Sequence, residues 1–221
     1  MGYWAYYLVI FGLSYGLRYP WLLGAVVVFW VFRKWIPDPF VYVRTFGLIR
    51  KLRMQIEANT ANVPARRDLA RIYLERRRPR AALKLLDEAR QRDPKSAELL
   101  HLTGLARYRL GDFDGALAPL GDAVAEDARI GFGEPYLIAG DALMGLDRWE
   151  DAAEAYQHFV ATNGSSIEGY VKLARARRRM RDDEGTKKAI AEAARTWAQI
   201  PAYRRRGQLR WWLRAWSGIL G

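Results

Sequence analysis

The sequence predicts an all-α protein whose main part is an α-solenoid of about four helix pairs. Two observations predict this architecture. Small residues recur in two registers that step together through residues 63–197, and residues 3–32 have the composition of a membrane segment. The expected domains are a hydrophobic membrane anchor (1–36), an amphipathic connector helix (37–62), a repeat domain (63–197, with repeats starting near 63, 97, 133 and 167) and a C-terminal amphipathic helix (198–221).

The two registers of small residues advance by 34, 36 and 34 residues. A small residue on one helix of a pair lets the second helix approach closely, and a bulky residue four positions away fills the neighbouring space. The small positions are Ala70, Gly104, Gly140 and Ala174 in the first register and Ala82, Ala116, Ala152 and Thr186 in the second. The bulky positions are Arg66, Leu100, Tyr136 and Tyr170, then Leu86, Leu120, Tyr156 and Ile190, of which Arg66 fits least well.

This pattern resembles the tetratricopeptide repeat family, most clearly in the second copy, where Leu110-Gly111-Asp112-Phe113 forms the expected turn. The third copy keeps this turn as Leu146-Asp147-Arg148-Trp149, and the fourth degrades it to Met180-Arg181-Asp182-Asp183. A two-residue insertion near residues 128–132 accounts for the longer central step. The resemblance implies stacked helix pairs that hold another polypeptide.

Between Tyr3 and Phe32 the only charged residue is Arg18, so this segment is predicted to lie in a membrane. It is long for one span and short for two. One interpretation is a short hairpin whose arms meet at Pro20, and the other is a single tilted helix that is kinked there. Trp21, Trp30 and Trp35 fall where membrane interfaces are expected in either case.

Basic residues follow the apolar segment and none precedes it, which places the repeats in the cytoplasm by the positive-inside rule. The segment lacks the features of a cleaved signal peptide, so we expect it to be retained. The 29 arginines against 7 lysines fit a GC-rich bacterial genome. The expected location is therefore a bacterial inner membrane. The flanking basic residues are Arg33, Lys34, Arg44, Arg50, Lys51 and Arg53.

The connector and the C-terminal helix are both amphipathic, and each has two interpretations. The apolar stripe of the connector, from Phe40 to Ile56, covers either the first repeat or the membrane surface. In the C-terminal helix, Leu209, Trp212, Leu213, Trp216 and Leu220 are predicted to share one face, with Trp211 directed elsewhere. That face either caps the fourth repeat or lies on lipid. The predicted membrane-interface residues are Trp21, Trp30, Trp35, Arg206, Arg210, Trp212, Arg214 and Trp216.

The net charge of +12 is concentrated at the two ends of the chain. Residues 1–62 carry +5, residues 63–169 carry −3 and residues 170–221 carry +10. Beside a membrane segment, this distribution favours anionic lipid or an acidic protein partner. Nucleic acid is disfavoured, because no recognised reader motif is present. We expect neither enzymatic activity nor a cofactor, because the sequence lacks a phosphate loop, a nucleophile elbow and a Cys/His metal motif.

The resemblance also implies a partner-binding groove, because in this family the first helix of each pair lines the concave surface. The matching residues are Arg67, Arg71 and Leu74 in the first repeat, His101, Leu105 and Tyr108 in the second, Leu137, Asp141 and Met144 in the third, and Val171, Arg175 and Arg178 in the fourth. Members that bind chaperone tails clamp a carboxylate through a lysine, asparagine and arginine set. Only Arg67 and Arg71 match that set, which disfavours such a receptor.

Together these features predict a membrane-anchored adaptor that recruits or organises a protein partner at the cytoplasmic face of the membrane. The alternative is a structural subunit of a membrane-associated homo- or hetero-oligomeric assembly. Both readings use the same repeats, so the repeat pattern favours neither of them.

Overall fold

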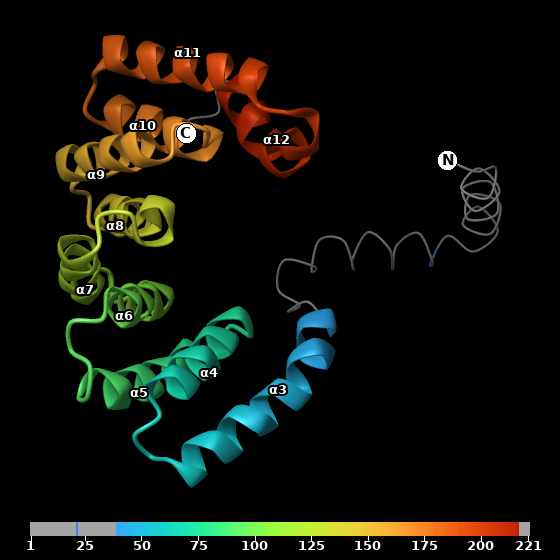
Figure 1. The fold of residues 1–221 in the computed structure, drawn as a ribbon. Coiled ribbons are helices and arrows are strands. Elements are labelled where there is room, and N and C mark those ends of the chain that lie inside the picture. Colours follow the sequence, from blue (N-terminus) through green and yellow to red (C-terminus); the bar gives the residue numbers. More distant parts are fainter. Residues whose placement is uncertain (1–20, 22–38, 217–221) are drawn as a thin grey trace. The chain divides into compact units, whose positions relative to one another are not determined.

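The computed structural model describes residue 21 and residues 39–216, and within these residues all regular structure is helical (Figure 1). Ten α-helices and one short 3-10 helix follow one another. They are α3 (Pro39–Ala58), α4 (Val63–Glu75), α5 (Pro79–Arg90), α6 (Ala97–Arg109), α7 (Phe113–Glu126), η1 (Ile130–Gly133), α8 (Glu134–Gly145), α9 (Trp149–Thr162), α10 (Ile167–Arg179), α11 (Asp183–Gln199) and α12 (Ala202–Trp216).

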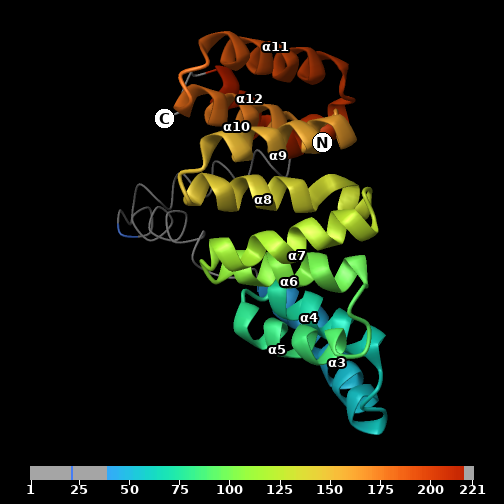
Figure 2. The same ribbon diagram turned by 90° about the vertical axis from the view of Figure 1, so that its left-hand side faces the viewer.

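The chain divides into two units between Phe46 and Gly47, and all four helix pairs belong to the second unit. The pairs are α4 with α5, α6 with α7, α8 with α9, and α10 with α11. Within the second unit they stack in sequence order, as two views at right angles show, and α12 packs against α10 and α11 (Figures 1 and 2). The prediction of a solenoid of four helix pairs is confirmed.

The small residues of the repeat pattern lie where the paired helices touch most closely. A Cβ atom on Gly104 would come within 2.5 Å of Leu120, and one on Gly140 within 2.4 Å of the Tyr156 ring. In both cases the obstructing residue is the bulky residue predicted on the second helix of the same pair. The two registers therefore report one contact, in which a missing side chain on one helix makes room for a large one on the other.

Each turn within a pair contains one residue in the left-handed backbone conformation. The residue that follows it donates its amide to the carbonyl five positions earlier, as Asp112 does to Arg107, which ends the first helix of the pair. The fourth turn keeps this geometry although its sequence is degraded, because short-range hydrogen bonds set it. The left-handed residues are Arg77 (φ 55°), Gly111 (φ 82°), Asp147 (φ 59°) and Arg181 (φ 62°).

The longer central step of the repeat corresponds to η1, which joins α7 to α8. Gly131, Phe132 and Gly133 all have positive φ in this segment. The two glycines adopt such angles without steric cost, and the side chain of Phe132 between them is exposed. The predicted insertion near residues 128–132 is therefore a tight loop that is accommodated between the second and third pairs.

The C-terminal part of α3 packs on the first helix pair. Ile49 and Leu52 are buried in the same apolar cluster as α4 and α5, and Ile56 packs against that cluster. Arg53 adds a hydrogen bond from Nη2 to the Tyr73 hydroxyl at 2.7 Å. This half of the predicted apolar stripe thus covers the start of the solenoid, which would otherwise expose apolar surface.

The C-terminal helix α12 packs through a different face from the one predicted. Gln208 and Trp211 contact the solenoid and Ala215 is buried, whereas Leu209 and Leu213 are 46% and 54% exposed. The side chain of Gln208 accepts a hydrogen bond from the Ile167 amide at 2.7 Å and donates one to the Ser165 carbonyl at 3.1 Å. Trp211 does lie on a different side from Leu209 and Leu213, as predicted, but its side and not theirs packs against the solenoid. A polar residue determines the orientation here, because it satisfies backbone groups at the start of α10.

The predicted anchor lies outside the described residues, except for Trp21, which is 68% exposed. Trp30 and Trp35 belong to the residues that are not described, as does the side chain of Trp216. In the part of the chain that is described, no helix combines the length and the apolar character that crossing a membrane requires.

Candidate functional site

A cleft of about 590 Å³ opens between the last two repeats and α12. The first helices of the second, third and fourth pairs, α6, α8 and α10, contribute to its walls. The second helix α9 and the terminal helix α12 complete it. Its lining residues are Tyr108, Asp141, Met144, Gly145, Asp147, Trp149, Tyr156, Val171, Lys172, Arg175, Arg179, Trp211 and Arg214.

The cleft brings together five of the predicted groove residues that the family resemblance singled out, one of which is Val171 of α10. They come from three different repeats: Tyr108 from α6, Asp141 and Met144 from α8, and Arg175 from α10. Residues that are more than 30 positions apart along the chain thereby face a single cavity. This is the arrangement expected when first helices line one side of a solenoid.

Asp141 is the centre of the polar floor of the cleft. It accepts hydrogen bonds from the Tyr156 hydroxyl at 2.7 Å and from Lys172 Nζ at 2.6 Å. Lys172 also forms an ion pair with Glu168 at 2.9 Å. Burial lowers the pKa of Lys172, but Asp141 and Glu168 outweigh this effect and raise it above its ordinary value. The ammonium group stays charged, and its charge is balanced locally.

Burial also raises the pKa of the Tyr156 hydroxyl, and the Asp141 carboxylate raises it further. The pKa of the Tyr108 hydroxyl is raised for the same two reasons, with burial again the larger. Both tyrosines are therefore neutral hydrogen-bond donors at physiological pH. The floor can hold a polar group.

Aromatic rings and guanidinium groups form the rim of the cleft. Arg179 lies over the Trp149 ring, 5.5 Å from its centroid, and Arg214 lies over the Trp211 ring at 4.7 Å. Each ring restrains the cation above it without neutralising its charge. The rim can therefore offer an anionic ligand positive charge and an apolar ligand a flat surface.

The sequence-based groove omitted Trp149, Lys172, Arg179 and Trp211, although all four line the cleft. The omission has a simple cause, because the family rule considers only certain positions of the first helices. Trp149 begins a second helix, and Trp211 belongs to the helix after the last pair. One sequence feature could have indicated these residues: a tryptophan at a repeat turn is followed, one repeat later, by a basic segment.

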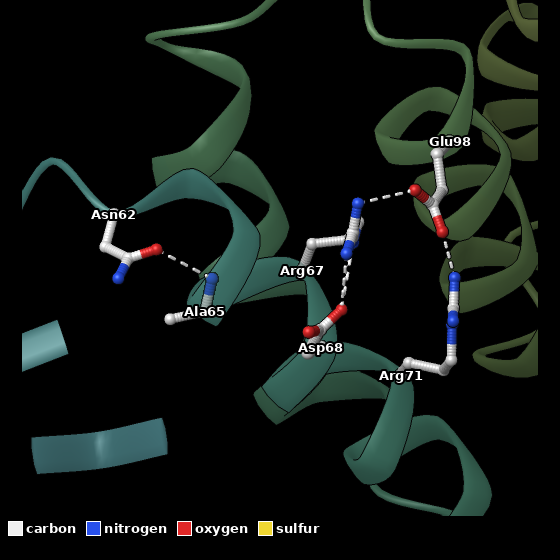
Figure 3. A network of polar contacts seen from close by, with 6 residues as sticks. All are labelled: Asn62, Ala65, Arg67, Asp68, Arg71 and Glu98. Carbon is white, nitrogen blue, oxygen red and sulfur yellow. Dashed lines mark hydrogen bonds and ion pairs between the residues drawn. The ribbon is translucent and has the colours of Figure 1, made fainter. Parts of the chain in front are cut away.

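In the first two repeats the predicted basic groove residues are already paired within the chain. Arg67 contacts Glu98 at 2.8 Å, and Arg71 forms an ion pair with the other oxygen of the same carboxylate (Figure 3). Arg67 also bonds Asp68 at 2.8 Å. Glu98 lies in the first turn of α6, so this network joins the first repeat to the second. A second cleft of about 490 Å³ lies at the same junction, and its lining residues, Leu74, Glu75, Arg77, Pro79 and Arg109, do not include Arg67 or Arg71.

The remaining predicted groove residues lie outside the cleft. Leu74 and His101 are buried, and burial lowers the pKa of His101, with Glu134 acting in the opposite direction. Leu105 and Leu137 pack against apolar clusters. Arg178 is exposed but does not line the cleft. Position in the repeat alone therefore does not make a residue accessible to a partner.

The repeats share a glutamate in the first turn of α6, α8 and α10, namely Glu98, Glu134 and Glu168. In the first junction this glutamate pairs with Arg71 of the preceding repeat. Arg175 occupies the same repeat position as Arg71, three steps later.

The helix that follows Arg175 along the stack is α12, whose sequence has no acidic residue. Among the described residues, no acidic side chain forms an ion pair with Arg175. Glu98 therefore neutralises the charge of Arg71 in the first repeat, whereas no carboxylate of the described residues pairs with the equivalent Arg175 in the last one. The described residues contain no cluster of three His, Cys, Asp or Glu side chains that could hold a metal ion.

Comparison with known proteins agrees with this fold. Residues 67–129 match the sequence model of the tetratricopeptide repeat family. A crystal structure of MamA superposes with a TM-score of 0.64 at 22% identity, covering 69% of this chain and 91% of that one. A second MamA structure gives 0.64 at 20% identity, covering 74% and 88%.

MamA of Desulfovibrio magneticus RS-1, from residue 41 to its end, gives 0.65 at 16% identity, covering 72% and 92%. No curated protein matches the sequence. At these identities the likeness shows the fold. Residues 67–129 are therefore similar to tetratricopeptide repeats, and the chain has a fold similar to that of MamA.

Proposed function

We propose that this chain is a membrane-anchored tetratricopeptide adaptor that captures an acidic segment of a protein partner in the cleft. One observation carries the proposal. Arg175 is equivalent to Arg71, whose charge Glu98 neutralises in the first repeat, but Arg175 faces an open cavity. An incoming carboxylate can take the place that the next repeat would have filled. A charge-assisted hydrogen bond of this kind is stronger than one between neutral groups.

The cleft also limits what else the partner segment contains. Arg175 and Arg179 supply positive charge, and Lys172 is balanced by Asp141 and Glu168. Met144 and Trp149 offer apolar surface beside these cations. The ligand that fits best is an extended peptide in which one or two carboxylates flank an apolar or aromatic side chain.

The proposal is tested by purifying the full chain in detergent with its bound proteins and identifying them by mass spectrometry. The double variant Arg175→Glu with Arg179→Glu should lose the partner that the unaltered chain retains. Arg178→Glu is the control, because it makes one such charge reversal on α10 outside the cleft. Equal recovery of the partner by all three proteins would refute capture in the cleft.

The membrane part of the proposal concerns the residues before α3. Reporter fusions after residue 60 should show cytoplasmic activity, because six basic residues follow the apolar segment. Periplasmic activity would exclude a cytoplasmic partner. A large homogeneous homo-oligomer in detergent, without a second polypeptide, would instead favour the structural-subunit alternative.

A further inference from the structure

Helix α12 has a second amphipathic face, on the side away from the solenoid. Its inner side is occupied: Gln208 bonds the start of α10, and Trp212 stacks on Trp197 with ring centroids 5.1 Å apart and planes 4° apart. These contacts determine which way the helix faces. Residues of the opposite side are therefore held outward by the fold.

The outward side combines two leucines with two arginines. Leu209 and Leu213 lie one turn apart and are 46% and 54% exposed. Arg206 and Arg210 lie one turn apart on the same side and are exposed as well, and the Arg210 guanidinium borders the Trp211 ring, 5.2 Å from its centroid. At about 100° per residue, all four fall within an arc of roughly 100°. Apolar side chains are thus bordered by positive charge on a helix that has five arginines and no acidic residue.

We propose that this outer face of α12, defined by Arg206, Leu209, Arg210 and Leu213, binds the surface of an anionic phospholipid membrane. The leucines would enter the boundary between headgroups and acyl chains, and the guanidinium groups would pair with lipid phosphates. Charge complementarity supports this ligand, because residues 170–221 carry a net charge of +10. The apolar segment of residues 3–32, with one charge in thirty positions, makes a membrane the expected neighbouring surface.

The structure changes which residues carry this role. Trp212 is stacked against Trp197, and Arg214 lines the cleft, so both are used by the solenoid. Leu209 and Leu213, by contrast, are available to lipid. One helix then serves two purposes: its inner side completes the partner cleft through Trp211 and Arg214, and its outer side meets the membrane. The inference goes beyond partner capture and does not depend on it.

The absence of cysteine from the sequence permits a direct test with single labels. A fluorophore is attached to Leu213→Cys in the full chain, reconstituted into vesicles of phosphatidylcholine alone or mixed with phosphatidylglycerol. Lys188→Cys on α11 is the matched control, because the side chain of Lys188 is 69% exposed and lies elsewhere on the solenoid. Quenching is measured with acrylamide in the water and with a nitroxide attached to the acyl chains.

In the anionic vesicles, the label at 213 should be quenched several-fold less by acrylamide and more by the nitroxide, and the label at 188 should not change. Raising the salt from 0.1 M to 1 M shortens the Debye length from about 10 Å to about 3 Å and should reverse the effect. Adding Arg206→Glu and Arg210→Glu should abolish it. Circular dichroism checks that each variant keeps its helices.

Two results would overturn the inference. One is equal acrylamide quenching at positions 213 and 188 in anionic vesicles at low salt. The other is protection of position 213 in detergent that grows with protein concentration, because a second copy of the chain would then cover this face. Neither result bears on partner capture, which is measured separately with the cleft variants.

Discussion

The first and last repeats use the same concave position in opposite ways. In the first repeat, Arg71 pairs with Glu98 of the next helix pair, and the junction is closed by charges within the chain. In the last repeat, the equivalent Arg175 faces a cleft, because the following helix has no carboxylate to offer. At the first junction the next repeat supplies a carboxylate to Arg71, whereas at the end of the described stack no repeat follows to supply one to Arg175. The candidate cleft therefore lies where the repetition stops.

The largest expected effect is on stability, and it compares the close helix contact of the second repeat with that of the third. Gly140→Ala should lower the free energy of unfolding by about 2 kcal/mol, because the new methyl group meets the Tyr156 ring, which Asp141 holds by a hydrogen bond. Gly104→Ala should cost less, because the new methyl group meets a leucine that no side-chain hydrogen bond holds and because alanine favours the helix. Thermal unfolding of the full chain in detergent measures both. An equal loss of stability in the two variants would show that the two helix contacts do not differ in rigidity.

A carboxylate introduced into the cleft should make the last junction resemble the first. Arg214→Glu removes one cation from the lining of the cleft and supplies an acidic group to the same lining, to which Arg175 also belongs. We expect capture of the acidic partner to weaken about tenfold, which corresponds to about 1.4 kcal/mol. Binding of the identified partner by calorimetry measures the effect. Arg206→Glu, on the outer face of the same helix, should leave capture unchanged, and an equal effect of both changes would place the site elsewhere.

Removing the carboxylate from the first junction should have a smaller effect, on stability and not on capture. Glu98→Gln removes the negative charge that Arg67 and Arg71 share and replaces one of its two acceptor oxygens by an NH2 donor. These side chains are partly exposed, so solvent screening limits the loss to about 1 kcal/mol. The loss should decrease at high salt. Glu184→Gln, which breaks an exposed pair with Lys188, is the control that should change little. Loss of partner capture by Glu98→Gln would contradict the assignment of stability to the first junction and of capture to the cleft.

The smallest expected effect is a pH dependence that comes from His101. Burial lowers its pKa in the folded protein below the ordinary value of about 6.5, so the unfolded chain binds more protons as the pH falls. The free energy of unfolding should therefore decrease between pH 7.5 and pH 5.5, by less than about 1 kcal/mol because Glu134 opposes the shift. Midpoints of thermal unfolding across this range measure it. His101→Gln should reduce the dependence, and an unchanged profile would assign it to other groups.

Much of the fold could be predicted because each repeat carries, within its own sequence, the residues that mark its helix contacts and its turn. Gly104 and Gly140 mark close helix contacts, and Gly111 marks a turn that needs a left-handed residue. The candidate site could be predicted only in part. Tyr108, Asp141, Met144 and Arg175 followed from family positions, but Trp149 and Trp211 lie on helices that those positions do not include.

The sequence by itself therefore determined the helix pairs, their order and the residues through which they touch, because these depend on spacing along the chain. Tertiary structure decided which charged residues stay open and which way α12 faces. The charges of Arg67 and Arg71 are paired because Glu98 of the next repeat forms ion pairs with both. Helix α12 turns its leucines outward because Gln208 satisfies the first amide of α10 and Trp212 stacks on Trp197. Hydrogen bonds and ring contacts between distant segments outweigh apolar periodicity there, and periodicity within one helix does not reveal them.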